Sequence, residues 1–139
     1  MKYPVKLLDM GGEFMLTCPD LPELTGVGET IEDALQEAVD GIQTTLQAYI
    51  SDRRDIPAPS ARKRGQYLIT LPPLAVAKVG LYEAMRNRGM RKADLARKLD
   101  LQMPQIDRLL DLRHSSKLEH VQGALEALGY RIELTVEAA

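Results

Sequence analysis

The chain has 139 residues, enough for one ordinary domain or two small ones and too few for a barrel enzyme or a doubly wound dinucleotide-binding fold. Hydrophobic residues make up 45% and charged residues 27%, which is typical of soluble globular proteins and suggests neither a disordered chain nor a membrane protein. The net charge of −2 is the sum of two opposed segments. Residues 1–52 carry 2 basic and 10 acidic residues, a balance of −8, and residues 85–117 carry 9 basic and 4 acidic residues, a balance of +5. Two segments with electrostatic fields of opposite sign indicate two different binding partners.

The cysteine count and the hydropathy pattern limit the cellular compartments in which the protein is expected. The single Cys18 excludes an intrachain disulfide, and the first residues lack the apolar run of a signal peptide. No stretch approaches the roughly 18 apolar residues of a membrane span. We therefore expect a cytoplasmic protein without a membrane partner. Aromatic residues reach only 4% and Trp is absent, so two small aliphatic cores are individually marginal, and we expect a homodimer or homotetramer.

Residues 1–73 are predicted to form an α+β domain with the order β-β-β-α-β. Alternating apolar residues predict strands around 2–7 and 13–18, joined by a turn at Gly11 and Gly12, and a short third strand over 24–28. Thr30 is predicted to be the N-cap of a helix, with Asp33 reaching back from the third helical position. The helix has an apolar stripe at helical spacing, and after a loop over 51–65 a fourth strand over 66–71 returns to the sheet. The stripe consists of Ile31, Leu35, Val39, Ile42, Leu46 and Tyr49.

Residues 74–139 are predicted to form an all-α domain. Four helices are expected over 74–88, 92–99, 103–112 and 118–128, with Gly89 and Gly129 as left-handed helix stops and a capping box from Ser116 to Glu119. A lone strand over 130–136 follows, and it has no partner in its own domain. Pairing with the same strand of a second subunit would satisfy its backbone and cover its edge. The predicted dimerisation residues are Tyr130, Ile132, Leu134 and Val136.

Residues 92–111 match the twenty-residue pattern of a helix-turn-helix. Apolar residues stand where the two helices pack together, and Ala96 stands where a larger side chain would separate them. The helices before and after complete a repressor-like bundle. The exposed positions are cationic or amide-bearing, and such side chains contact phosphates and base edges in the major groove. The predicted DNA-binding residues are Arg91, Lys92, Gln102, Met103, Gln105, Arg108, Arg113, His114 and Lys117.

Three aspartates depart from this pattern. Asp100 stands at the turn position where a helix-turn-helix usually has Gly, and Asp tolerates a left-handed conformation better than most residues. Asp107 and Asp111 would repel phosphates if they faced the groove. They either pair with Arg108, Arg113 or Lys117 or mark a helix flank that points away from DNA.

The order of these elements resembles the HicB antitoxins of HicA/HicB type II toxin-antitoxin systems, in the subtype that carries a helix-turn-helix. The segments that carry the resemblance run along nearly the whole chain: 1–5, 21–25, 28–34 and 94–99. The resemblance implies that the N-terminal domain is partly ribonuclease H-like and masks a HicA-like ribonuclease toxin that cleaves mRNA. It also implies that the C-terminal domain binds a palindromic operator of its own operon as a repressor. The toxins of this family are small and basic, which suits the acidic first segment. No toxin-contact residue is identified.

Enzymatic chemistry has little support in the sequence. Asp9, Glu13, Asp20 and Glu29 lie near predicted strand ends, but turns and loops are ordinary places for acids, and two-metal nuclease chemistry needs converging carboxylates. His114 and His120 are six residues apart, outside the spacing of zinc pairs. We therefore predict no catalytic residue, metal or cofactor. Two alternatives stay open: a stand-alone regulator with an N-terminal domain that senses a small molecule, and a metal-dependent nuclease.

Overall fold

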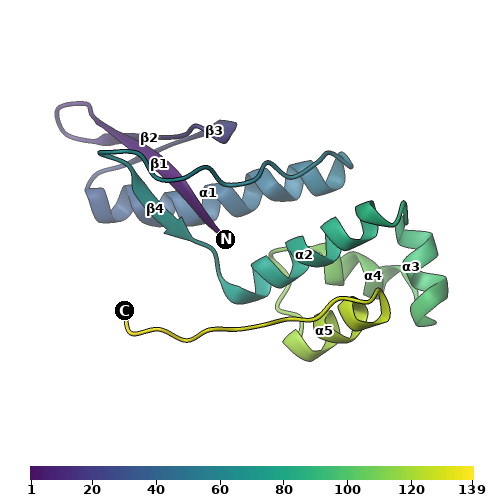
Figure 1. Ribbon diagram of the computed structural model, residues 1–139. Helices are drawn as coiled ribbons and strands as arrows, with labels where there is room; N and C mark the ends of the chain where they lie inside the picture. The colour runs from purple at the N-terminus through teal and green to yellow at the C-terminus, as the bar shows by residue number, and fades with distance from the viewer. The chain divides into compact units, whose positions relative to one another are not determined.

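The computed structural model describes residues 1–139, which divide into two compact units, Met1–Pro72 and Pro73–Ala139 (Figure 1). The first unit is built on a four-stranded antiparallel sheet and the second on short helices. No helix combines the length and the apolar character that crossing a membrane requires.

The first unit has the predicted order β-β-β-α-β. Its elements are β1 (Lys2–Asp9), β2 (Phe14–Cys18), β3 (Leu21–Gly28), α1 (Ile31–Ser51) and β4 (Tyr67–Thr70), with the strands in the spatial order β3-β2-β1-β4. The third strand is longer than predicted and begins at Leu21, next to a register shift in its pairing with β2. Thr30 caps α1 as expected, because its hydroxyl accepts a hydrogen bond from the backbone nitrogen of Asp33 over 3.0 Å.

The core of this unit lies between α1 and one face of the sheet, and the predicted stripe on the helix is partly wrong. Ala34, Ala38, Ile42 and Leu46 are fully buried, whereas Ile31 is 40% exposed and Leu35 and Val39 are half-buried. Small residues face the sheet here because the helix and the strands approach closely. A Cβ on Gly28 would lie 2.7 Å from the Ala34 Cα. The helix is therefore rotated toward its alanines.

The second unit contains α2 (Pro73–Asn87), α3 (Lys92–Leu99), α4 (Met103–Leu110) and α5 (Leu118–Ala127). Gly89 and Gly129 have the left-handed backbone of helix stops, with φ of 62° and 84°. Leu81, Leu95, Ile106 and Leu128 are fully buried and form the centre of an aliphatic core. The predicted helices are present, with α4 ending two residues early.

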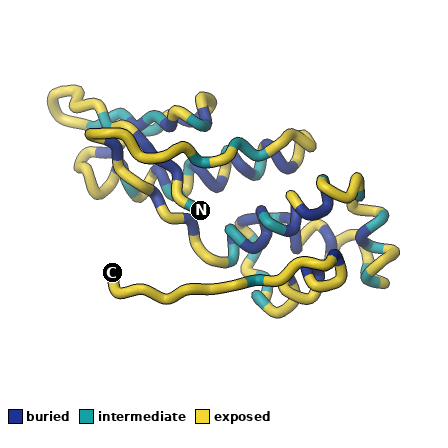
Figure 2. The backbone as a smooth tube through the Cα atoms, viewed as in Figure 1, coloured by how far each residue is buried: buried dark blue, intermediate teal, exposed yellow.

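Two details of the second unit differ from the predictions. Residues 130–139 form no strand in this chain, because nothing in it pairs with them and a strand needs a ladder of backbone hydrogen bonds. Figure 2 shows this segment as largely exposed. The capping box is also absent: Lys117 occupies the N-cap of α5, and the Ser116 hydroxyl donates to the Arg108 carbonyl oxygen instead, over 3.3 Å.

Candidate functional site

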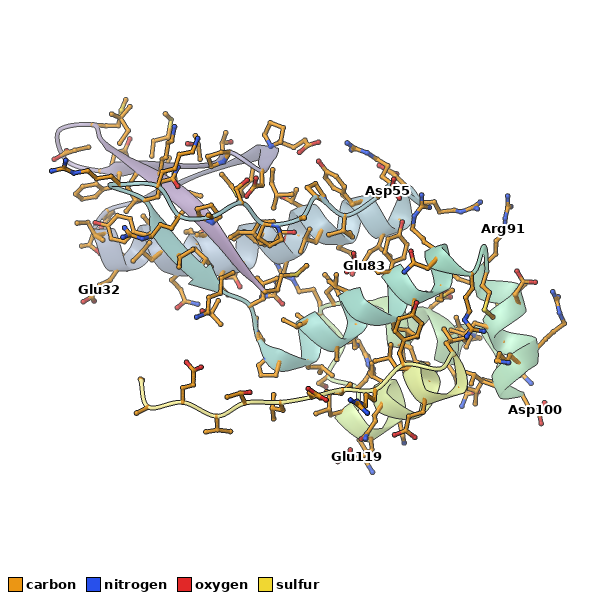
Figure 3. All side chains as sticks on the ribbon, in the orientation of Figure 1. Glu32, Asp55, Glu83, Arg91, Asp100 and Glu119 are labelled. Atoms are coloured by element: carbon orange, nitrogen blue, oxygen red, sulfur yellow. The ribbon has the colours of Figure 1, made fainter.

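The pair α3 and α4 has the connectivity of a helix-turn-helix. Asp100 ends α3 in the left-handed conformation, with φ 53° and ψ 49°, and Leu101 N donates to the Ala96 carbonyl oxygen over 3.0 Å. Asp100 thus adopts the left-handed conformation that the turn requires, as expected for an aspartate at this position. Leu95 and Ile106 are fully buried where the helices meet. Figure 3 labels Arg91 and Asp100, which bracket α3.

The exposed side of α4 carries polar and cationic side chains from its first residue onward. Gln102 is the N-cap, and its backbone nitrogen donates to Gln105 Oε1 over 2.9 Å. Met103 is 42% exposed, and Gln105 and Arg108 are exposed one turn apart. The opposite side of the helix is buried. The backbone of α4 is thus fixed by packing on one side, and its exposed side presents Met103, Gln105 and Arg108 to solvent.

Gln105 and Arg108 line a cavity of about 560 Å³ between α4, the loop over 111–117 and α5. His114 and Lys117 lie on its wall, and leucines from the α3–α4 turn form part of its apolar lining. The structure therefore brings together four of the predicted DNA-binding residues. Sequence reasoning missed the other polar residues of this wall, which are Ser115, Ser116 and His120.

Lys78 of α2 is fully buried and holds the end of α4 in place. Its ammonium donates to the carbonyl oxygens of Arg108, Asp111 and His114 over 2.8, 2.7 and 2.7 Å. Burial lowers the pKa of this ammonium, and the nearby Asp111 acts in the opposite direction. The last carbonyls of a helix have no partner within the helix, and a cation is the favoured group there. Lys78 thus fixes both α4 and the loop that bears Arg113 and His114.

The two aspartates left open by the sequence have different partners. Lys92 Nζ lies 2.8 Å from Asp107 Oδ1, so Asp107 pairs across the two helices with α3 rather than within α4. Asp111 Oδ1 accepts from the backbone nitrogen of Arg113 over 3.0 Å. Arg91 is the N-cap of α3, and its backbone nitrogen donates to Asp94 Oδ2. Arg91 and Lys92 thus belong to the start of α3 and are absent from the cavity lining.

The predicted dimerisation residues lie at and after the end of α5. Tyr130 N donates to the Leu125 carbonyl oxygen over 3.0 Å, which anchors the start of this segment. Beyond it, Leu134 is 61% and Val136 89% exposed. Large apolar side chains are thus presented on an extended segment that has no neighbouring strand.

In the first unit, two of the acids considered for metal chemistry fix the backbone. Asp9 Oδ1 accepts from Gly11 N over 2.9 Å within the β1–β2 turn, and Asp20 Oδ2 accepts from Ser60 N over 2.8 Å. No group of three or more His, Cys, Asp or Glu side chains is placed to hold a metal ion. Asp9 therefore stabilises the β1–β2 turn, and Asp20 fixes the long segment before β4 through its hydrogen bond to Ser60.

Comparison with known proteins gives consistent results along the whole chain. A family model described as HicB_like antitoxin of bacterial toxin-antitoxin system matches residues 2–80. Antitoxin HicB of Pseudomonas fluorescens is 43% identical over 139 residues, covering 99% of this chain and 95% of that protein. Antitoxin HicB 2 of Photorhabdus laumondii is 37% identical, covering 96% and 95%. Antitoxin HicB of Escherichia coli K12 is 33% identical, covering 98% and 99%.

Proposed function

The chain belongs to the HicB antitoxin family of bacterial toxin-antitoxin systems, and we propose that it neutralises a cognate HicA-like toxin that cleaves mRNA and represses its own operon. The observation that carries the proposal is the similarity to HicB antitoxins over nearly the full length of both chains. The first unit binds the toxin and the second binds operator DNA. Members of this family are antitoxins and not enzymes, so neither a nuclease nor a stand-alone sensor accounts for the chain as well.

The distribution of charge supports toxin binding by the first unit. No Lys or Arg stands between Leu7 and Asp52, a stretch that holds ten carboxylates. A protein that binds RNA needs cations to meet phosphates, and an acidic partner both attracts such a surface and competes with RNA for it. The first unit therefore suits the task of covering the RNA-binding surface of a toxin.

The surface of α4 and the following loop supports DNA binding by the second unit. Gln105 and Arg108 are exposed on α4, whose C-terminal end is hydrogen-bonded to Lys78. Glutamine and arginine side chains recognise adenine and guanine edges in the major groove. His114 and Lys117 lie beside them on the cavity wall and are suited to phosphates. The family model ends at residue 80, so this part of the proposal depends on the full-length relatives and on the geometry of α3 and α4.

The exposed segment after α5 supports a dimer of second units. Its alternating apolar residues would pair with the same segment of another copy and gain both backbone hydrogen bonds and burial. Two helix-turn-helix units joined in this way would read two half-sites of a palindromic operator about one helical turn apart. A homodimer is the smallest assembly with this property, and a homotetramer would join two such pairs.

Fluorescence anisotropy with labelled DNA tests the repressor half. The DNA is taken from upstream of the gene, and a shuffled DNA of equal length is the comparison. We expect salt-sensitive binding with a preference for the upstream DNA. Gln105→Ala with Arg108→Ala should lower that preference more than Lys92→Ala does, and Arg64→Ala in the first unit is the matched control for the one positive charge that is lost. Equal binding of both DNAs by the wild-type chain would contradict the repressor half.

A further inference from the structure

Three apolar side chains form a row across the sheet on the face opposite α1. The register pairs Leu8 with Met15 and Met15 with Val27, and directly paired residues of antiparallel strands project on the same side. Their chain neighbours Leu7 and Leu16 are paired with each other and project to the α1 face, where Leu16 is fully buried. Because side chains alternate along a strand, Leu8, Met15 and Val27 project to the other face.

The three side chains of this row lie outside the core and are partly exposed to solvent. Leu8 is 56% and Val27 50% exposed, and Met15 between them is half-buried. The next row on the same face consists of Lys6, Thr17 and Thr25, as expected for a solvated surface. Contiguous exposed apolar side chains rimmed by polar residues are typical of binding surfaces. We call Leu8, Met15 and Val27 the outer apolar row.

Carboxylates rim the other side of the outer apolar row. Glu13 directly precedes Phe14 and Glu29 directly follows Gly28, and Phe14 is paired with Gly28. The two exposed glutamates therefore stand at adjacent strand ends, where like charges are unfavourable. α1 begins at this same end with Glu32, which Figure 3 labels, and Asp33. A cationic partner would relieve this repulsion.

We propose that the outer apolar row is the docking surface for the toxin, and that the matching surface of the toxin has an apolar centre flanked by Lys or Arg. This inference depends on the proposed function, which it extends by naming the surface and the chemistry of the partner. The apolar row supplies affinity through burial, and Glu13 and Glu29 supply orientation and a fast encounter. A second copy of this chain is a poorer occupant, because residues 1–52 carry 2 basic and 10 acidic residues and two such surfaces repel each other.

The test measures the affinity of the full-length chain for the toxin by calorimetry, with the product of the neighbouring open reading frame as the toxin. Leu8→Lys with Val27→Lys places a cation at each end of the row and should weaken binding about 100-fold or more. Leu68→Lys is the matched control, because Leu68 is 45% exposed on the same face but lies on β4, at the other edge of the sheet. It should change the affinity by less than about threefold.

A second variant covers the case in which two lysines disturb the fold. Val27→Thr keeps a β-branched residue on β3 and should weaken binding about tenfold with an unchanged circular dichroism spectrum. Wild-type affinity in both row variants would overturn the inference and leave the proposed function intact, whereas no binding by the wild-type chain would overturn the proposed function itself. A loss of self-association in Val27→Thr, seen by light scattering without toxin, would also overturn the inference, since the row would then join two copies.

Discussion

Lys78 and Arg108 are joined by a hydrogen bond of 2.8 Å from a fully buried ammonium to the last turn of the helix proposed to read DNA. The same ammonium binds two more carbonyl oxygens, so its removal would take one donor from each of three partly buried carbonyl groups. We predict that Lys78→Met lowers the free energy of unfolding by about 3 kcal/mol. Lys98→Met, on the exposed side of α3, should leave it nearly unchanged. Urea denaturation of both variants checks this, and equal stabilities would contradict the role of Lys78.

Two glycines in equally regular structure should respond oppositely to alanine. Gly28 has no room for a Cβ, which would lie 2.7 Å from the Ala34 Cα, whereas a Cβ on Gly80 of α2 meets nothing within 4 Å. Gly28→Ala should therefore destabilise the chain by about 1–3 kcal/mol. Gly80→Ala should stabilise it by about 0.5–1 kcal/mol, because alanine favours a helix interior. Thermal unfolding of the two variants compares them directly, and a stabilised Gly28→Ala would show that α1 does not approach β3 as described.

The contact between Tyr49 and Glu23 should make stability depend on pH. The Tyr49 hydroxyl donates to both carboxylate oxygens over 2.8 and 2.9 Å, which lowers the pKa of Glu23 below its ordinary 4.5 and raises the pKa of Tyr49 above 10.0. The stabilisation from Glu23 is therefore present above pH 4.5 and is lost as the pH falls through the lower folded value. That from Tyr49 is present below pH 10 and is lost as the pH rises through the higher folded value.

Glu23→Gln is the variant that tests this pH dependence. It removes the titrating carboxylate, so the loss of stability below pH 4.5 should be smaller than in the wild-type chain. Glu37→Gln, on the exposed side of α1 and outside its first turn, controls for the change in net charge. Denaturation midpoints measured between pH 3 and pH 7 give the comparison, and parallel curves for the wild-type chain and Glu23→Gln would rule out the effect.

Asp107 is predicted to weaken DNA binding rather than to stabilise the fold. Both side chains of its ion pair with Lys92 are about half exposed. Exposed ion pairs of this kind contribute at most about 1 kcal/mol to the free energy of unfolding. Asp107→Asn should leave the unfolding midpoint nearly unchanged, and it should tighten DNA binding because it removes a negative charge and frees Lys92 for phosphate. Glu126→Gln on α5 is the control for net charge. Weaker DNA binding by Asp107→Asn would mean that the ion pair positions Lys92 for DNA.

Patterns that depend on neighbouring residues were readable from the sequence. The order of strands and helices, the Thr30 cap and the left-handed Asp100 follow from alternation, helical spacing and turn chemistry, and the structure has all three. The core stripe of α1 was misjudged because large aliphatic residues were assumed to face the sheet. The close approach of α1 to the sheet favours Ala34 and Ala38 at the buried positions. The distance between the helix and the sheet cannot be read from the sequence.

Features that depend on distant residues were missed. Lys78 is the sole charged residue between Gln66 and Tyr82, which was a signal, but its acceptors lie 30 to 36 residues later along the chain. The outer apolar row also needs the pairing of three strands to become visible. The segment after α5 has the alternation of a strand, yet no strand forms within one chain, because pairing there requires a partner that this chain does not supply.

The central claim is that the chain switches off a ribonuclease by covering its RNA-binding surface. The most direct measurement is cleavage of a labelled mRNA by the purified toxin, titrated with the full-length chain. The account predicts that cleavage falls in proportion to added chain and ends near equimolar amounts, and that Leu8→Lys with Val27→Lys shifts the titration to higher concentration while Leu68→Lys does not. Cleavage that continues undiminished in an excess of the wild-type chain would contradict it.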